Sequence, residues 1–259
     1  MSKIGVTILA SGSNGNCIMV HCGDQAILID CGISLRMLRC RLREEGLEES
    51  WIKAILVTHE HNDHVKGLRV ASRHLGVPVF ATAKCAEKLH SEWDIGVMTM
   101  IAACNDFPLS GFNVRAFPVS HDAVDTVGYV FTRESAKIGV ATDLGVTTQM
   151  THFQLRDCST LVLESNFDLN MLAASSRPWN LKSRILSPIG HLSNADTAKF
   201  LPSVVTRNTR NVILAHISGD CNTYDIAERT ARGTLHELAR DDVFLTYGRR
   251  DAPVPTVWC

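Results

Sequence analysis

The sequence predicts a mixed α/β protein in which two β-sheets pack face to face and helices cover the outside. Short runs of β-branched and apolar residues, separated by turn formers, occur in both halves of the chain. In each half these runs are followed by segments whose apolar residues recur with helical spacing. The chain has 259 residues, 45% of them hydrophobic, which supports a large core and excludes a disordered or fibrous protein.

The first part of the chain predicts five strands and two helices. Turn-forming sequences such as SGSNGN and GDQ separate the first three strands. Apolar residues at helical spacing identify the helices. The expected strands are residues 4–10, 17–22, 26–31, 52–58 and 78–82, and the expected helices are residues 33–46 and 65–76.

The second part of the chain repeats this pattern. Strands are expected at residues 112–120, 127–133, 137–143, 160–165 and 211–218, and helices at residues 195–205 and 227–241. No internal repeat, low-complexity tract or linker divides the chain, so one domain is expected over residues 1–259. Polar residues fall at the ends of several strands, where a functional site would be assembled.

Charge and cysteine content narrow the class of protein. Lys and Arg total 26 and Asp and Glu total 27, so the net charge of −1 gives no overall positive field for nucleic acid. Any phosphate binding must therefore be local. The nine cysteines include no CxxC pair, and no apolar run approaches the roughly 20 residues of a membrane span. These features predict a cytoplasmic protein with reduced thiols and no membrane association.

The sequence THEHNDH at residues 58–64 is the strongest functional signal. It places His59, His61, Asp63 and His64 directly after a predicted strand. Imidazole and carboxylate groups are preferred ligands of first-row divalent cations. Alternate residues of an extended turn point in different directions, so this one segment could serve two metal ions. The alternative is a histidine-rich surface loop.

A dinuclear site needs further ligands, and three candidates follow predicted strands. These are His121, Asp143 and His216. A lone histidine in such a place is as often a hydrogen-bonded structural residue. The remaining histidines, at positions 21, 74, 90, 152 and 236, are expected to be structural.

Several motifs together resemble the metallo-β-lactamase superfamily, and more closely its YycJ/WalJ-like exonuclease branch. The resemblance covers nearly the whole chain. The motifs that carry it are LASGSNGN (9–16), ILIDCG (27–32), THEHNDHVKG (58–67), VSHDAVDTVGY (119–129), ATDLG (141–145), LESNFD (163–168), LKSRILSPIGHLSN (181–194) and LAHIS (214–218).

This resemblance implies a four-layer αββα sandwich with two divalent metal ions, zinc or manganese. His59, His61 and His121 would hold one metal. Asp63, His64 and His216 would hold the other, and Asp143 would bridge them. Asp30 would orient the ligand loop from behind the ligands.

The resemblance also assigns catalytic roles to Asp63, Glu164 and His191. Glu164 and His191 would deliver a proton to the departing 3′-oxygen, because a neighbouring carboxylate favours a protonated imidazole. The alternative for these two residues is a buried pair that only fixes a loop.

Residues predicted to bind substrate lie in two segments. Residues 175–194 contain no Asp or Glu but include Arg177, Lys182 and Arg184, and Ser193 and Asn194 add neutral donors. In the SGSNGN loop, Ser13 and Asn16 either face substrate or belong to a tight hairpin. This loop lacks the GK[ST] ending of a P-loop, so no nucleotide cofactor is expected.

The favoured function is a metal-dependent phosphodiesterase acting on DNA, and the resemblance implies a 5′ to 3′ exonuclease. Residues 143 to 216 leave no room for the large inserted domain of RNA-processing members of the superfamily. Two alternatives remain: a small-molecule hydrolase of thioester or cyclic-nucleotide type, and a non-catalytic metal-binding regulator. The absence of Asp and Glu from residues 175–194 argues against a small-molecule hydrolase. The complete set of candidate metal ligands argues against a non-catalytic regulator. The sequence leaves the oligomeric state open.

Overall fold

The structure is a computed structural model that describes residues 3–93 and 95–259, and it divides into two compact units. The first unit contains Met1–Ala116, Ala123–Val127 and Gly248–Cys259. The second contains Phe117–Asp122 and Gly128–Tyr247. The chain enters each unit more than once, and the expected single domain over residues 1–259 stays a prediction.

The sheet of the first unit has the strand order β14-β1-β2-β3-β4-β5-β6. The pairs from β14 to β3 are antiparallel, and those from β3 to β6 are parallel. The SGSNGN sequence forms the turn between β1 and β2. The strands are β1 (Ile4–Ala10), β2 (Cys17–Cys22), β3 (Gln25–Ile29), β4 (Ile52–Leu56), β5 (Val79–Thr82), β6 (Met98–Ile101) and β14 (Val254–Trp258).

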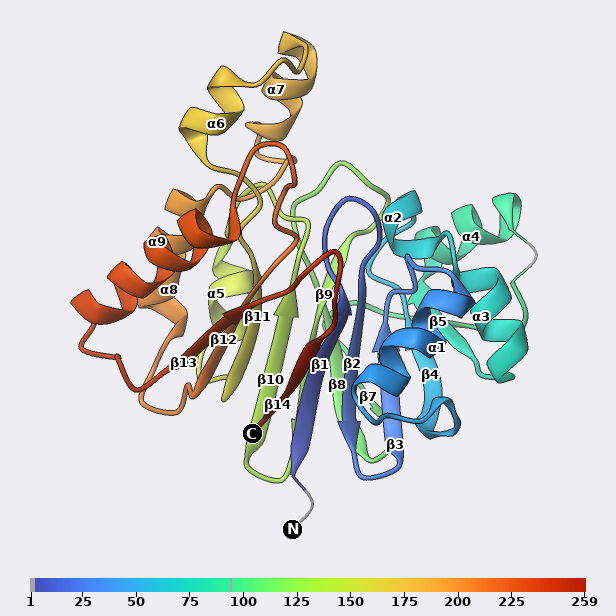
Figure 1. Cartoon of the computed structure of the whole chain (residues 1–259). Helices are drawn as coiled ribbons and strands as arrows, with labels where there is room; N and C mark the ends of the chain where they lie inside the picture. The colour runs from blue at the N-terminus through green and yellow to red at the C-terminus, as the bar shows by residue number, and fades with distance from the viewer. Residues whose placement is uncertain (1–2, 94) are drawn as a thin grey trace. The chain divides into compact units, whose positions relative to one another are not determined.

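Helices α1 (Leu35–Glu44), α3 (Leu68–Leu75) and α4 (Ala83–Glu92) lie against one face of this sheet (Figure 1). Their apolar residues, including Leu38 and Leu68, share one buried cluster with Leu28 and Ile55 of the strands. The unit also contains the 3₁₀ helix η1 (Glu49–Trp51), the short helix α2 (Asn62–Val65) and β7 (Asp106–Leu109), which pairs antiparallel with β8 (Phe112–Pro118).

The second unit contains the neighbouring strands β13-β12-β11-β10-β9, part of a sheet order that ends in β8 and β7. Strands β9 and β10 are antiparallel, whereas β10, β11, β12 and β13 are parallel. The carboxyl ends of these parallel strands therefore meet at one edge of the sheet. The strands are β9 (Val127–Arg133), β10 (Ala136–Ala141), β11 (Thr160–Glu164), β12 (Asn211–Ala215) and β13 (Phe244–Tyr247).

Three helices of the second unit, α5 (Gln149–Leu155), α8 (Asn194–Val204) and α9 (Tyr224–Glu237), pack on this sheet through a shared apolar core. Two more, α6 (Leu169–Ala174) and α7 (Trp179–Ile185), stand clear of these three beyond the carboxyl ends of the strands (Figure 1). We call residues 169–190, which contain α6, α7 and the turn that follows, the helical arm. Among the described residues, no helix is both long and apolar enough to cross a membrane.

The structure corrects several element boundaries. The helix expected at residues 65–76 is α3, which begins only at Leu68, after the separate short helix α2. The helix expected at residues 227–241 begins earlier, because the Thr223 side chain caps its amino end. Helices α4 to α7 and strands β6, β7, β13 and β14 are additions to the prediction. Several of these elements are short, and β6, β7, β13 and β14 lie at sheet edges. Short and half-exposed segments carry little hydrophobic periodicity.

Candidate metal centre

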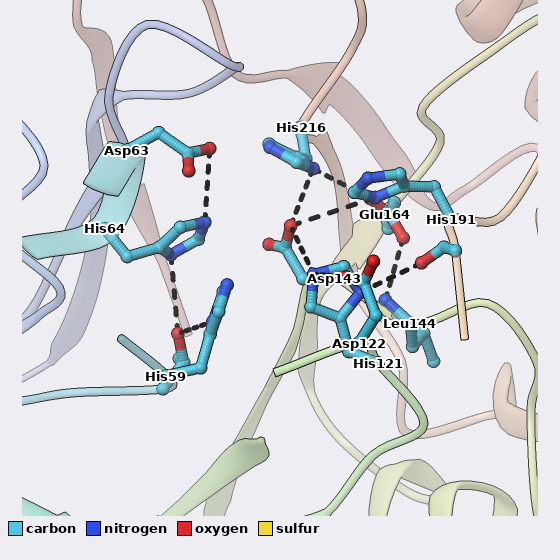
Figure 2. A network of polar contacts seen from close by, with 12 residues as sticks. His59, Asp63, His64, His121, Asp122, Asp143, Leu144, Glu164, His191 and His216 are labelled. Atoms are coloured by element: carbon cyan, nitrogen blue, oxygen red, sulfur yellow. Dashed lines mark hydrogen bonds and ion pairs between the residues drawn. The ribbon is translucent and has the colours of Figure 1, made fainter. Parts of the chain in front are cut away.

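The first group of candidate ligands lies on a single turn of the first unit. We call residues 59–64, which follow β4 and run into α2, the ligand turn. His59 and His64 are fully buried, whereas His61 and Asp63 are half-buried. The His59 ring lies 4.7 Å from the His61 ring and 4.2 Å from the His64 ring, centroid to centroid. Figure 2 shows His59, Asp63 and His64.

Asp30 holds the ligand turn from the neighbouring parallel strand. It follows β3, has a positive φ of 60° and is buried. Its Oδ2 accepts a hydrogen bond from His64 Nδ1 at 2.7 Å, and its Oδ1 accepts one from the Thr58 backbone N–H at 2.8 Å. With Nδ1 engaged in this way, Nε2 is the nitrogen of His64 that would ligate a metal.

Thr58 orients a second imidazole, and sequence reasoning gave it no role. Its hydroxyl donates to Asp30 Oδ2 at 2.8 Å and lies 2.9 Å from His59 Nδ1. Because that hydroxyl proton is committed to Asp30, the oxygen accepts from His59 Nδ1, which leaves Nε2 of His59 as its ligand atom. The only sequence signal was its position at the start of the THEHNDH motif.

The loop between β1 and β2 supports the ligand turn by backbone and side-chain contacts. The Asn16 backbone N–H donates to the Asp63 carbonyl at 2.8 Å, and its side-chain amide lies 3.1 Å from His64 Nε2. A Cβ on Gly32 would lie 1.7 Å from the Asp63 carbonyl oxygen, so only glycine fits there. Asn16 is therefore buried against predicted ligands, whereas Ser13 is exposed on the loop.

The second group lies at the carboxyl ends of three parallel strands in the second unit. Glu164 ends β11 opposite Ala215 of β12, and Asp143 and His216 follow β10 and β12. We call Asp143, Glu164, His191 and His216 the strand-end cluster. One ligand atom from each of the four lies within 4.8 Å of the others. All are buried except His191, whose side chain is 20% exposed.

Glu164 is the hub of the strand-end cluster (Figure 2). Its Oε1 accepts from His191 Nδ1 and His216 Nδ1, each at 2.8 Å, and its Oε2 accepts from two backbone N–H groups, of Leu144 and Leu192. Burial alone would raise the pKa of the Glu164 carboxyl. The two imidazoles outweigh this effect and lower its pKa to about 2, so the group is a carboxylate at neutral pH.

His121, in the segment after β8, completes the candidates of the second unit. Its Nδ1 donates to the Gly190 carbonyl at 3.0 Å, which leaves Nε2 as the ligand atom. Burial lowers the pKa of His121, although the nearby Asp143 carboxylate opposes the shift. The imidazole is therefore kept neutral, which is the form that binds a metal.

Two residues that contact His216 and His121 were not predicted from the sequence as functional candidates. The Asn166 amide donates to the His216 carbonyl at 2.7 Å and lies 3.3 Å from His216 Nδ1, so it fixes the His216 turn. An Asp122 oxygen lies 3.4 Å from His121 Nε2, and Asp122 also pairs with Arg184. Asn166 belongs to the quoted LESNFD motif, and Asp122 directly follows a predicted ligand.

The residues predicted to bind substrate already have internal partners. Arg177 pairs with Asp220 at 3.1 Å, and Lys182 donates to the Ala173 carbonyl at 2.7 Å. Ser193 is buried and caps α8, and Asn194 is buried in contact with Ser165 and Asn222. Substrate binding by these residues and by Arg184, Ser13 and Asn16 stays a prediction.

Comparisons with known proteins identify the family. The family model described as "Beta-lactamase superfamily domain" matches residues 25–217. The chain is 34% identical over 234 residues to Exodeoxyribonuclease YycJ of Bacillus anthracis, covering 89% of each protein. It is 30% identical to Exodeoxyribonuclease WalJ of Streptococcus pneumoniae serotype 2 (strain D39 / NCTC 7466), covering 94% of the chain and 92% of the relative.

The protein belongs to the beta-lactamase superfamily, as the sequence motifs indicated. Its structure matches the metallo-beta-lactamase fold protein YhfI from Bacillus subtilis with a TM-score of 0.74, covering 97% of this chain and 99% of that one. At 13% identity this match speaks for the fold alone. The predicted α/β metallo-β-lactamase fold is thereby confirmed, and with it the class of hydrolases to which the chain belongs.

Proposed function

We propose that the protein is a metal-dependent exodeoxyribonuclease that hydrolyses phosphodiester bonds of DNA. The observation that carries this proposal is the similarity to Exodeoxyribonuclease YycJ over 89% of both proteins. The similarity to the WalJ exonuclease over an even larger share of the chain supports the same function over a small-molecule hydrolase or a non-catalytic regulator. A 5′ to 3′ direction and a cytoplasmic location belong to the proposal.

The donor chemistry of both units fits divalent metal ions. Each unit presents imidazole and carboxylate groups. Hydrogen bonds to groups behind the rings fix the Nδ1 atoms of His59, His64 and His121, which leaves Nε2 as the atom that would face a metal. Two zinc or manganese ions would polarise a phosphoryl oxygen and activate a water molecule. Asp30 would orient His64, and Asp63 would also lie at the reacting centre. The proposed ligands are His59, His61, Asp63, His64, His121, Asp143 and His216.

His191 is the proposed proton donor to the departing oxygen. Its Nδ1 is 2.8 Å from the Glu164 carboxylate, and a carboxylate only accepts, so Nδ1 carries a proton directed at Glu164. The opposite nitrogen, Nε2, is then the one that can deliver a proton to substrate. The partial exposure of His191, in contrast to the buried Glu164, is consistent with this division between a donor and its positioning carboxylate.

A product analysis tests the proposed activity. In the presence of Mn²⁺ or Zn²⁺, single-stranded or double-stranded DNA labelled at its 3′ end should be shortened progressively, whereas DNA labelled at its 5′ end should release the label in the first products. Both should remain intact in the presence of a chelator. His191→Ala should lower the rate about 10²- to 10⁴-fold on DNA. It should have a smaller effect on bis(p-nitrophenyl) phosphate, whose leaving group needs no proton.

The matched control is His236→Ala. His236 is an exposed histidine of the same unit that pairs with Asp241, and its loss should leave both rates unchanged. Equal losses on both substrates for His191→Ala would remove the proton-donor role. Intact DNA under all metal conditions would overturn the proposed function.

A further inference from the structure

The helical arm is firmly attached to the turn that carries His191. Ser120 Oγ donates to the Pro188 carbonyl at 2.8 Å, and the Gly190 carbonyl, two residues further on, accepts from His121. A Cβ on Gly190 would lie 2.2 Å from the Ile185 carbonyl, so the end of α7 and this turn are in close backbone contact. The position of α7 is therefore linked to that of the strand-end cluster.

The arm packs against the rest of its unit through a small apolar cluster. Leu172 and Ile185 are buried with Phe167 and Cys221. In contrast, Trp179, the first residue of α7, is 76% exposed. An indole is one of the largest apolar groups, and its exposure on α7 leaves a flat aromatic face available for stacking.

Three cationic residues belong to the same segment of the chain as this indole. Residues 169–195 contain no Asp or Glu, whereas Arg177, Lys182 and Arg184 all lie in this segment. Trp179, Lys182 and Leu186 recur at the i, i+3, i+7 spacing that shares one helical face, and Leu186 is 48% exposed. The carboxylates that contact the arm include Asp220, which pairs with Arg177, Asp122, which pairs with Arg184, and Asp168, which caps α6.

An exposed aromatic face beside cations, without acidic residues in the same segment, matches the chemistry of a single DNA strand. Nucleobases stack on aromatic side chains, and lysine or arginine attracts the adjacent phosphates. A helix rises about 1.5 Å per residue, so Trp179 lies about 10 Å along α7 from the turn that leads to His191. At about 3.4 Å per nucleotide, that length corresponds to roughly three nucleotides of a stacked strand.

We propose that Trp179 stacks against a nucleobase of single-stranded DNA a few nucleotides from the bond to be cleaved, with Lys182 beside the phosphates. This proposal rests on the proposed nuclease function and specifies where its substrate strand is held. Trp179 is then a substrate-positioning residue, which changes the affinity for the strand and leaves the chemical step unchanged.

The experiment measures binding and catalysis separately. Fluorescence anisotropy with the metal-loaded enzyme and a phosphorothioate-linked, labelled oligothymidylate gives the affinity without cleavage. Trp179→Ala should weaken this binding about 5- to 100-fold, and Trp179→Phe, which keeps an aromatic face, should restore most of it. On cleavable DNA, Trp179→Ala should raise KM with little change in kcat, and hydrolysis of bis(p-nitrophenyl) phosphate should stay at the wild-type rate.

Phe153→Ala is the matched control, because Phe153 is 71% exposed on α5 of the same unit but outside the arm. It should bind the oligonucleotide like the wild type. Wild-type affinity of Trp179→Ala for the oligonucleotide would overturn the proposal. A loss of affinity that accompanies a changed oligomeric state, measured by sedimentation, would overturn it as well. If oligonucleotide binding depends on Trp179 but no DNA is cleaved, the nuclease function fails while the stacking site stands.

Discussion

The ligand turn of the first unit and the strand-end cluster of the second unit are built in opposite ways. The ligand turn takes four candidate ligands from six consecutive residues after one strand. The strand-end cluster takes its four members from separate segments between Asp143 and His216. Chain geometry alone keeps the first group together, whereas the second group depends on the alignment of three parallel strands.

Both regions nevertheless use a buried carboxylate in the same way. Asp30 accepts from an imidazole Nδ1 and from the backbone and hydroxyl of Thr58. Glu164 accepts from two imidazoles and from two backbone N–H groups. Glu164, in the site assembled from distant segments, thus has four donors where Asp30 has three, so the strand-end cluster should suffer more when the charge of its carboxylate is removed.

Removing the charge of Glu164 should have the largest effect. Glu164→Gln keeps the shape but turns an amide N–H toward groups that are themselves donors, so we expect a loss of about 3–5 kcal/mol in unfolding free energy. Urea denaturation of the metal-free protein measures it. Glu237→Gln, at an exposed glutamate of α9, should change stability by less than about 0.5 kcal/mol. A similarly small loss for Glu164→Gln would show that the hub is not a stability determinant.

Crowding the ligand turn should be the next most costly change. Gly32→Ala would place a methyl group 1.7 Å from the Asp63 carbonyl oxygen, and we expect about 3 kcal/mol of destabilisation as the turn moves. The control is Gly233→Ala in α9, where an added Cβ meets open space. That change should stabilise the protein by about 0.5–1 kcal/mol. Thermal unfolding distinguishes the two, and equal Tm values would show that the turn adapts freely.

Asp30→Asn tests the smaller of the two carboxylate networks. We expect a loss of about 1.5–3 kcal/mol in unfolding free energy, because charge-assisted hydrogen bonds to His64 and Thr58 are weakened. Zinc affinity, measured by competition with a chromophoric chelator, should fall about 10- to 100-fold. Asp24→Asn, at an exposed turn residue, serves as the control. An Asp30→Asn loss larger than that of Glu164→Gln would reverse the comparison.

The smallest effect concerns a histidine outside both regions. Burial lowers the pKa of His21 below its ordinary value of 6.5, although a backbone hydrogen bond at Gly23 opposes the shift. As pH falls below 6.5 the unfolded chain therefore takes up this proton first, and stability falls by at most about 1.4 kcal/mol per pH unit. His21→Leu should flatten the dependence of urea midpoints on pH between 5 and 6.5. An unchanged slope would assign the pH dependence to other groups.

The sequence determined the local parts of this protein. Hydrophobic runs located the central strands β1 to β4 and β9 to β12, because buried strands need unbroken apolar sequences. The four candidate ligands of the turn were found together because their spacing is local. Edge strands such as β13 and short helices such as α7 were missed, because their stability comes from neighbours and not from their own sequence pattern.

Only the tertiary structure decided how the separated residues meet. No spacing in the sequence shows that Glu164 binds both His191 and His216, that Thr58 links Asp30 to His59, or that Asn166 fixes the His216 turn. The tertiary structure also decided that Ser193 and Asn194 are buried while Trp179 is exposed to solvent. Local sequence determines which side chains are available at each position. Their partners depend on strand register and burial, because these result from many weak contacts between segments that are far apart in the chain.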